Sequence, residues 1–174
     1  VVSLQMSPRV TRMFKHVLVP SQGFIRKFMR ETGEVSMRSG LDISALEGVD
    51  TLKADLSEMS AWTGSKNKKE SVDQLSKFVE KIVLTSGREK VEFYTKGKLS
   101  CTLMPLDVDV KDTTGAGDIQ LAALAAGLIE NRNEIDALKF ATVASSLSVR
   151  AVGIRKAILS RSEISKRVQY VRYA

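Results

Sequence analysis

Short hydrophobic runs rich in β-branched residues alternate with amphipathic segments along the first half of the chain. Runs of this kind are typical of buried strands, and the segments between them suit helical crossovers. Strands are expected at residues 1–5, 16–19, 49–54 and 81–85, and helices at residues 8–14, 42–46, 55–62 and 70–78. Because parallel strands need crossover connections, this alternation predicts an α/β fold with a mostly parallel sheet.

The pattern changes after residue 90. Residues 91–95 and 99–103 flank Lys96-Gly97-Lys98, which predicts an antiparallel hairpin. The segment from Gly117 is rich in alanine and apolar on nearly all sides, so a helix there is expected to be buried against the sheet. Further helices are expected at residues 134–149 and 162–168.

The most informative stretch of the sequence is Asp112-Thr113-Thr114-Gly115-Ala116-Gly117-Asp118, which opens the buried helix. The small residues Gly115, Ala116 and Gly117 allow backbone N–H groups to converge on an anion at the positive end of a helix. The Asp118 carboxylate is electrostatically unfavourable beside an anion, which suggests that it accepts a proton from a hydroxyl. Helix capping and a tight turn are the structural alternative. The motif indicates phosphate chemistry.

The segment from Asp112 to Ala125 resembles the C-terminal signature of the ribokinase-like (PfkB) family of sugar and nucleoside kinases. Four other segments resemble family segments in the expected order: HVLVPSQGFIR at 16–26, LKADLSEMSAWTG at 52–64, IVLTSG at 82–87 and ATVASSLSVRAVG at 141–153. The resemblance covers about residues 16–160. It implies a ribokinase-like fold in which helices flank a mostly parallel sheet in three α/β/α layers.

The resemblance also implies roles for the matched residues. Asp118 would be the catalytic base, and the backbone of residues 115–117 would form the anion hole. Glu58 would hold Mg²⁺ through water, and Asp112, with Thr114, would shape the loop or contribute to a monovalent-cation site. The other nucleotide-binding residues implied by the match are Asp55, Thr85, Ser86, Gly87 and Thr142.

The sequence departs from the family's pattern at four positions. Ser21 replaces a proline, Asp55 replaces an asparagine, Lys90 replaces a glycine that often follows the TSG turn, and Thr142 lies where many members carry asparagine. Structural alternatives stay open for the weaker matches. Asp55 would serve equally as a helix N-cap, Glu58 as a solvated helix residue, and residues 85–87 as a common strand-ending turn.

The family's substrate motif of the type G-G-x-x-x-N and its lid-forming strands are not found in these 174 residues. The resemblance therefore implies that residues 1–174 are the C-terminal portion of a kinase domain whose N-terminal part and lid are missing. A fragment, one part of a split protein and an incomplete gene product would all explain this. The open edge of a half-sheet would favour a homo-oligomer or pairing with a missing half.

Composition narrows the class of protein further. The hydrophobic content of 43% suffices for a core, and the single cysteine, Cys101, excludes an internal disulfide. No apolar stretch has membrane-spanning length, so a soluble, cytoplasmic protein is expected. The net charge of +7 and the Lys66, Lys68 and Lys69 cluster raise the alternative of nucleic-acid binding. That cluster has no interleaved aromatic residues, which makes the alternative weaker.

Taken together, the residues and the resemblance predict an ATP-dependent phosphotransferase that phosphorylates a hydroxyl of a sugar, polyol or nucleoside. Its expected cofactors are ATP and Mg²⁺, with a monovalent cation as a further implication. The main alternative is a truncated or non-catalytic nucleotide-binding module of the same fold. The Gln22-Gly23-Phe24 segment leans toward the inositol-kinase branch but does not identify the substrate.

Overall fold

The structure is a computed structural model that describes residue 11 and residues 13–174. The strand expected at residues 1–5 and most of the helix expected at residues 8–14 lie outside the described residues. Six strands form one mixed sheet in the order β1-β4-β5-β6-β7-β8, and β2 and β3 form a separate two-stranded sheet. The chain divides into two compact units: Val1–Thr85 with Phe93–Ser100, and Ser86–Glu92 with Cys101–Ala174.

The first unit contains the parallel strands that the sequence predicts. Strands β1 (Leu18–Pro20), β4 (Thr51–Ala54) and β5 (Lys81–Thr85) pair in parallel, with Leu18 opposite Thr51 and Thr51 opposite Lys81. Their apolar side chains enter the core, where Leu52, Ile82 and Leu84 are at most 1% exposed. Burial on both faces accounts for the continuous apolar character of these runs.

Helices of the first unit pack on this core. They are α2 (Gln22–Ile25), the 3₁₀ helix η1 (Ile43–Leu46), α3 (Leu56–Thr63) and α4 (Lys68–Leu75). The Trp62 indole N–H donates to the Ser21 hydroxyl over 2.8 Å, and the Phe24 and Trp62 rings lie 5.4 Å apart. Ser21, which replaces the family's proline, therefore joins α2 to α3 inside the core.

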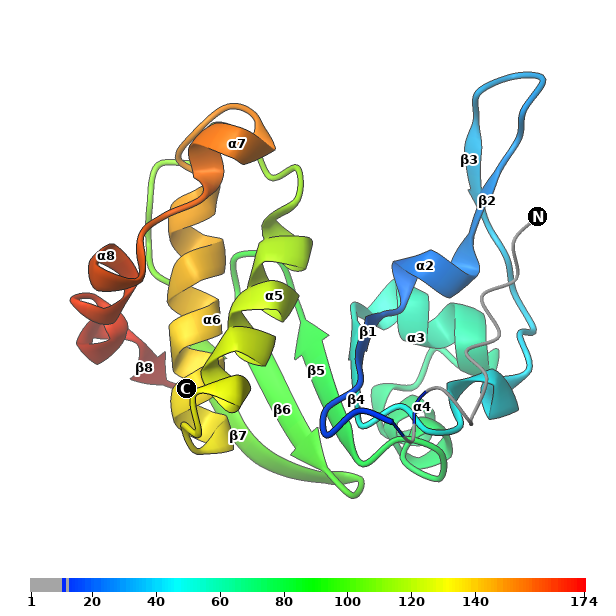
Figure 1. Ribbon diagram of the computed structural model, residues 1–174. Coiled ribbons are helices and arrows are strands. Elements are labelled where there is room, and N and C mark those ends of the chain that lie inside the picture. The colour runs from blue at the N-terminus through cyan, green and yellow to red at the C-terminus, as the bar shows by residue number, and fades with distance from the viewer. Residues whose placement is uncertain (1–10, 12) are drawn as a thin grey trace. The chain divides into compact units, whose positions relative to one another are not determined.

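An antiparallel hairpin, β2 (Arg26–Phe28) and β3 (Val35–Met37), follows α2 and was not predicted. Figure 1 shows it extending beyond the end of α2. Every residue of both strands is exposed, so the buried-and-exposed alternation that marks a strand in a sequence is absent.

The hairpin predicted after residue 90 is confirmed as β6 (Val91–Thr95) and β7 (Lys98–Met104). Its two turn residues, Lys96 and Gly97, have φ of 50° and 76°, the left-handed values that a tight hairpin turn requires. Strand β8 (Arg172–Tyr173) pairs antiparallel with β7.

The second unit is built on two long helices, α5 (Ala116–Ile129) and α6 (Glu134–Ser148), which lie side by side (Figure 1). Gly127 allows their close approach, because a Cβ atom there would lie 2.9 Å from the Ala137 Cβ. Shorter elements complete the unit: α7 (Ile154–Ala157), α8 (Arg161–Ser165) and the 3₁₀ helix η2 (Val168–Tyr170).

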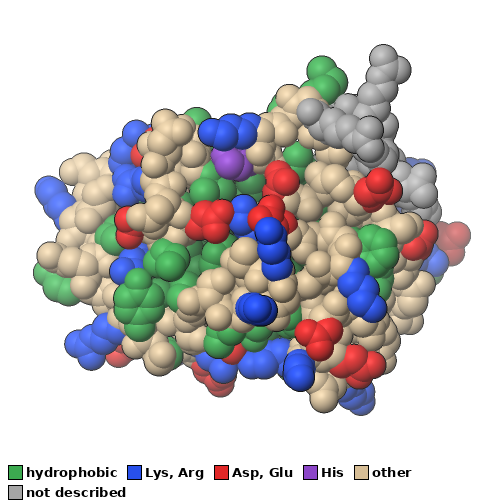
Figure 2. Space-filling model, turned by 90° about the horizontal axis from the view of Figure 1, so that it is seen from below, with side chains coloured by type: hydrophobic (Ala, Val, Ile, Leu, Met, Phe, Trp, Pro, Cys, Tyr) green, Lys and Arg blue, Asp and Glu red, His purple; other side chains and the backbone are tan. Residues whose placement is uncertain are grey.

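The surface carries charges of both signs. On the face shown in Figure 2, Lys and Arg side chains are interspersed with Asp and Glu side chains rather than gathered in one basic field. Within the described residues, no helix has the length and apolarity needed to cross a membrane.

Candidate functional site

The N-terminus of α5 contains the predicted anion site. Gly115 has φ of 78° and ψ of −1°, a left-handed conformation that glycine adopts without a steric penalty, and α5 begins at the next residue. The Ala116 N–H donates to the Thr113 carbonyl oxygen over 3.2 Å. The N–H groups of Gly115 and Gly117 donate to no acceptor in the described part of the chain. Two of the three amides of the expected anion hole are therefore available in this structure, and the three-amide site stays a prediction.

Asp118 lies in the first turn of α5, one residue after Gly117. Its side chain is exposed, and the helix start has no side-chain cap. The helix dipole favours negative charge at this end, so a carboxylate and a bound anion are both stabilised by the same backbone. A hydroxyl and an electrophilic phosphate can thus be brought to one helix terminus.

Asp112 ties the loop before α5 to the turn after α6. Its Oδ1 accepts the Thr114 N–H over 2.9 Å, and its Oδ2 accepts the Gly153 N–H over 3.0 Å. The backbone hydrogen bond from Thr114 is the largest cause that holds the pKa of Asp112 below its usual value; the Thr114 side chain and the Gly153 N–H add to it. This geometry suits the loop-shaping role considered for Asp112.

A second connection joins the same two segments. The Val149 carbonyl oxygen accepts the N–H groups of Lys111 and Asp112, over 2.7 and 3.1 Å. The end of α6 and the start of the Asp112 loop are therefore fixed to each other by backbone as well as by the Asp112 side chain. This holds the loop in place ahead of Gly115.

Asp55 and Glu58 form a capping box at the start of α3. The Glu58 N–H donates to Asp55 Oδ1 over 2.8 Å, and the Asp55 N–H donates to Glu58 Oε2 over 3.0 Å. The N-cap explanation of Asp55 is thus confirmed. Burial is the main cause that raises the pKa of Glu58 above its usual value, so the carboxylate would gain from a nearby cation.

Glu58 fits the donor chemistry that Mg²⁺ requires. Mg²⁺ usually takes one or two carboxylates, several waters and substrate phosphates. Because Asp55 occupies Oε2 of Glu58, the other carboxylate oxygen is the one suited to hold metal-bound water. No group of three or more His, Cys, Asp or Glu side chains able to hold a metal ion occurs within the residues that the structure describes.

The Thr85-Ser86-Gly87 segment leaves β5 in a closed turn. The Ser86 N–H donates to the Lys90 carbonyl oxygen and the Glu89 N–H to the Ser86 carbonyl oxygen, both over 3.0 Å. Gly87 has φ of 56°, and a Cβ atom built there would have no atom within 4 Å. Lys90 replaces the family's second glycine. Its Nζ forms a salt bridge with Oε1 of Glu92 over 3.4 Å.

Thr142 does not present its side chain to a nucleotide in this structure. It is 1% exposed, and its hydroxyl donates to the Leu138 carbonyl oxygen over 2.8 Å, within α6. The hydroxyl of Thr142 is therefore satisfied inside its own helix in this structure, and a nucleotide contact at this residue stays a prediction.

Ser146, four residues further along α6, makes a connection that the sequence did not indicate. Its hydroxyl donates to the Thr142 carbonyl oxygen over 2.8 Å and accepts the Leu106 N–H over 3.0 Å. It anchors the segment that leads from β7 to the Asp112 loop. A serine in an apolar helix gives no signal of such a contact in sequence.

The structure groups the candidate residues in two sets. In the first unit, Asp55 and Glu58 are joined directly, and Thr85 contacts the β4 backbone through its hydroxyl, 3.5 Å from the Ala54 carbonyl oxygen. In the second unit, Asp112, the Gly115–Gly117 backbone and Asp118 form one continuous loop and helix start.

Residues 22–160 match the pfkB family of carbohydrate kinases, so the chain belongs to this family. The ribokinase of Lactococcus lactis is 34% identical over 95 residues, which are 55% of this chain and 31% of that protein. The chain thus spans about a third of the length of this curated relative.

Solved structures show the ribokinase fold. The Arabidopsis thaliana ribokinase complexed with ribose and ATP superposes with a TM-score of 0.71 at 22% identity, covering 93% of this chain and 51% of that chain. A pyrophosphate-dependent kinase in the ribokinase family, complexed with a pyrophosphate analogue and myo-inositol, superposes with a TM-score of 0.74 at 23% identity, covering 91% and 56%. The predicted ribokinase-like α/β fold is therefore confirmed.

Proposed function

We propose that this chain carries the phosphoryl-transfer part of an ATP-dependent kinase that phosphorylates a hydroxyl of a sugar or polyol. The observation that carries the proposal is the start of α5, where two available backbone amides and the Asp118 carboxylate share one helix turn. Two amides at a helix terminus suit a phosphate, and the carboxylate suits a hydroxyl proton. Membership of the pfkB family supports the same activity.

Each residue has a defined part in this mechanism. The Asp118 carboxylate accepts the proton from the substrate hydroxyl as that oxygen attacks phosphorus. The N–H groups of Gly115 and Gly117 donate to the phosphoryl oxygens as negative charge shifts among them. Glu58 orients metal-bound water. When bound, ATP would supply the phosphoryl group, with ADP as the leaving group, and Mg²⁺ would neutralise phosphate charge.

The proposed class of acceptor follows from the family and from the ligands of two similar solved structures. Ribose occupies the Arabidopsis enzyme and myo-inositol the pyrophosphate-dependent one. The Gln22-Gly23-Phe24 segment of this chain forms α2, where Phe24 packs on Trp62. The resemblance of this segment to the inositol-kinase branch is what favours a polyol as the acceptor. A monovalent cation at Asp112 is part of the proposal.

The test is phosphorylation of ribose, fructose, myo-inositol and nucleosides by the purified natural gene product, with ATP or pyrophosphate as donor and with Mg²⁺ present or chelated. Asp118→Asn should lower kcat by about 10²- to 10⁴-fold while ATP affinity changes little. Asp136→Asn is the matched control, because Asp136 lies in the first turn of α6 and is also exposed. That variant should keep its activity.

Retention of most activity by Asp118→Asn would overturn the base assignment. ATP binding by the wild type without transfer to any acceptor would favour the non-catalytic nucleotide-binding module instead. Equal losses in Asp118→Asn and Asp136→Asn would mean that helix stability, rather than proton transfer, controls the rate.

A further inference from the structure

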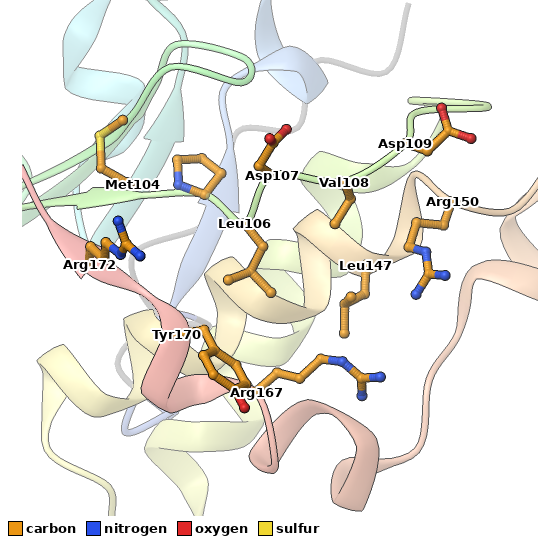
Figure 3. A pocket seen from close by; sticks show the side chains of 11 residues that line it. Met104, Leu106, Asp107, Val108, Asp109, Leu147, Arg150, Arg167, Tyr170 and Arg172 are labelled. Atoms are coloured by element: carbon orange, nitrogen blue, oxygen red, sulfur yellow. The ribbon is translucent and has the colours of Figure 1, made fainter.

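A cavity of about 740 Å³ lies in the second unit, away from the start of α5. Its walls come from residues 104–109, from the C-terminal end of α6 and from residues 167–172 (Figure 3). None of Gly115, Ala116, Gly117 and Asp118 lines it. The volume falls in the range of about 300–1,000 Å³ that small-molecule sites occupy.

Three arginines line the cavity: Arg150, Arg167 and Arg172. The guanidinium groups of Arg150 and Arg172 form no hydrogen bond or ion pair with the residues that the structure describes, whereas their backbones take part in a turn and in strand pairing. Arg167 donates from Nη1 to the Glu163 carbonyl oxygen over 3.1 Å, and its positive charge also interacts with the Glu163 carboxylate, where it is a minor cause of the lowered pKa. The cavity therefore holds guanidinium donors that are not used by the fold.

Two carboxylates, Asp107 and Asp109, also line this cavity. In Figure 3 the Asp107 and Asp109 side chains turn away from the guanidinium groups of Arg150 and Arg167, which extend on the same side of the cavity. The Glu163 carboxylate caps α8 instead, where it accepts the Ser160 N–H over 2.9 Å. Three arginines and two aspartates line the larger cavity, so positive charge is in excess there.

A smaller cavity of about 280 Å³ adjoins the first and shares Arg150 and Arg167 with it. Lys111 and Lys156 also line the smaller cavity, together with the carboxylates of Asp109 and Glu163. The two arginines thus lie where both cavities meet, with two ammonium groups on one side. In the lining of the smaller cavity the cationic side chains outnumber the carboxylates, which favours an anion at this junction.

The floor of the larger cavity is apolar. Leu147 is 6% exposed, Leu106 is partly buried, and the Tyr170 side chain is 62% exposed although it faces the cavity. An exposed tyrosine ring beside aliphatic side chains suits a planar or weakly polar body. Planar guanidinium forks suit phosphate oxygens.

We propose that this cavity is a second binding site, which takes the phosphate ester of a small metabolite. The phosphate lies on Arg150 and Arg167, and the body of the ligand lies against Leu106 and Tyr170. Sugar phosphates and nucleoside monophosphates share this chemistry. The site differs from the start of α5, to which the proposed function assigns the transferred phosphate.

Binding of ribose 5-phosphate and of AMP, each compared with ribose and adenosine, tests the site by calorimetry at physiological salt. The protein should carry Asp118→Asn, so that no turnover occurs. Each phosphate ester should bind at least about tenfold more tightly than its unphosphorylated partner, because charge-assisted contacts to phosphate are strong. Arg150→Gln/Arg167→Gln should weaken both esters by at least about tenfold.

Arg155→Gln is the matched control, because Arg155 is an exposed arginine of α7 that lines neither cavity. It should leave both affinities within about twofold, and circular dichroism should show every variant folded. Tighter binding of AMP would assign the site to nucleotides, and tighter binding of ribose 5-phosphate to sugar phosphates; either supports the site. Equal binding of esters and unphosphorylated partners, or equal losses in Arg155→Gln and the double variant, would overturn it.

Discussion

The starts of α5 and α6 differ although both helices are long, apolar and part of the same unit. Both carry an aspartate at the third helical position, Asp118 and Asp136. Asn133 caps α6 and accepts the Asp136 N–H over 2.9 Å, whereas Gly115 precedes α5 and provides no side-chain cap. A capped start stabilises a helix, and an uncapped one leaves donors for a ligand. The proposed function therefore assigns a ligand to the start of α5 and a purely structural role to the start of α6.

After Asp118→Asn, the variant expected to have the largest effect on kcat is Gly115→Ala. A Cβ atom disfavours the left-handed conformation by about 1–2 kcal/mol, so the Gly115 and Gly117 amides would be reoriented. The loss of one anion-hole donor typically lowers kcat by about 10²- to 10³-fold. Steady-state kinetics would show a loss of that order if the amides act on the phosphoryl group.

Gly97→Ala separates this effect from backbone strain. Gly97 has φ of 76°, close to the 78° of Gly115, and lies in the β6–β7 turn, where a Cβ atom would meet only Ser76 at 3.6 Å. The same steric penalty should lower the melting temperature without a matching loss of kcat. Comparable losses of kcat in Gly97→Ala and Gly115→Ala would contradict the proposal that the amides at the start of α5 act on the phosphoryl group.

A smaller effect is expected at the capped helix. Asn133→Ala removes the side chain that accepts the Asp136 N–H, and such a change costs about 1 kcal/mol of folding stability. For a protein of this size the melting temperature should fall by about 2–4 °C. Activity should be unchanged, which thermal denaturation and initial rates together would verify.

The smallest effect concerns two capping boxes that resemble each other, Asp55 with Glu58 and Ser160 with Glu163. Burial raises the pKa of Glu58, whereas the Ser160 side chain is the main cause that lowers the pKa of Glu163. The contribution of Glu58 to folding stability is therefore fully present at pH values below its pKa in the unfolded chain. It is lost as the pH rises through its pKa in the folded protein. The Glu163 contribution is present above its unfolded pKa and is lost as pH falls through the folded one.

At neutral pH, Glu58→Gln and Glu163→Gln should accordingly change the melting temperature in different directions. The first should keep or slightly raise the melting temperature, and the second should lower it, with both differences shrinking near pH 4. Glu58→Gln should also raise the Mg²⁺ concentration that supports half-maximal activity, and Glu163→Gln should not. Parallel shifts in the two variants would contradict the distinct environments described for the two glutamates.

Much of the fold could be predicted because burial leaves a regular pattern. Strands β1, β4 and β5, the β6–β7 hairpin and helices α5 and α6 all show it. The β2–β3 hairpin and β8 could not be found, since their strands have two or three residues and are exposed throughout. Their pairing depends on neighbours that local sequence does not reveal.

Only some parts of the candidate site could be predicted from the sequence. The Asp112–Asp118 motif describes local backbone, so its loop and helix start follow from the residues themselves. Thr142 was expected at a nucleotide, but which face of α6 is buried depends on packing against other elements. The arginine-lined cavity combines residues from three separate segments, and no spacing in the sequence brings Arg150 and Arg167 together.

The contact between Gly127 and Ala137 has a mechanical consequence for the whole helix pair. Gly127 lies near one end of α5 and Asp118 near the other, nine residues away, which corresponds to about 14 Å along a helix. A side chain at position 127 would meet the Ala137 backbone 3.1 Å away and act as a wedge. The pair would pivot about that point, and the displacement would be greatest at the far end. In the proposed mechanism, a methyl group at position 127 would thus reorient the α5 amides that hold the phosphoryl group, although it lies about 14 Å from Asp118.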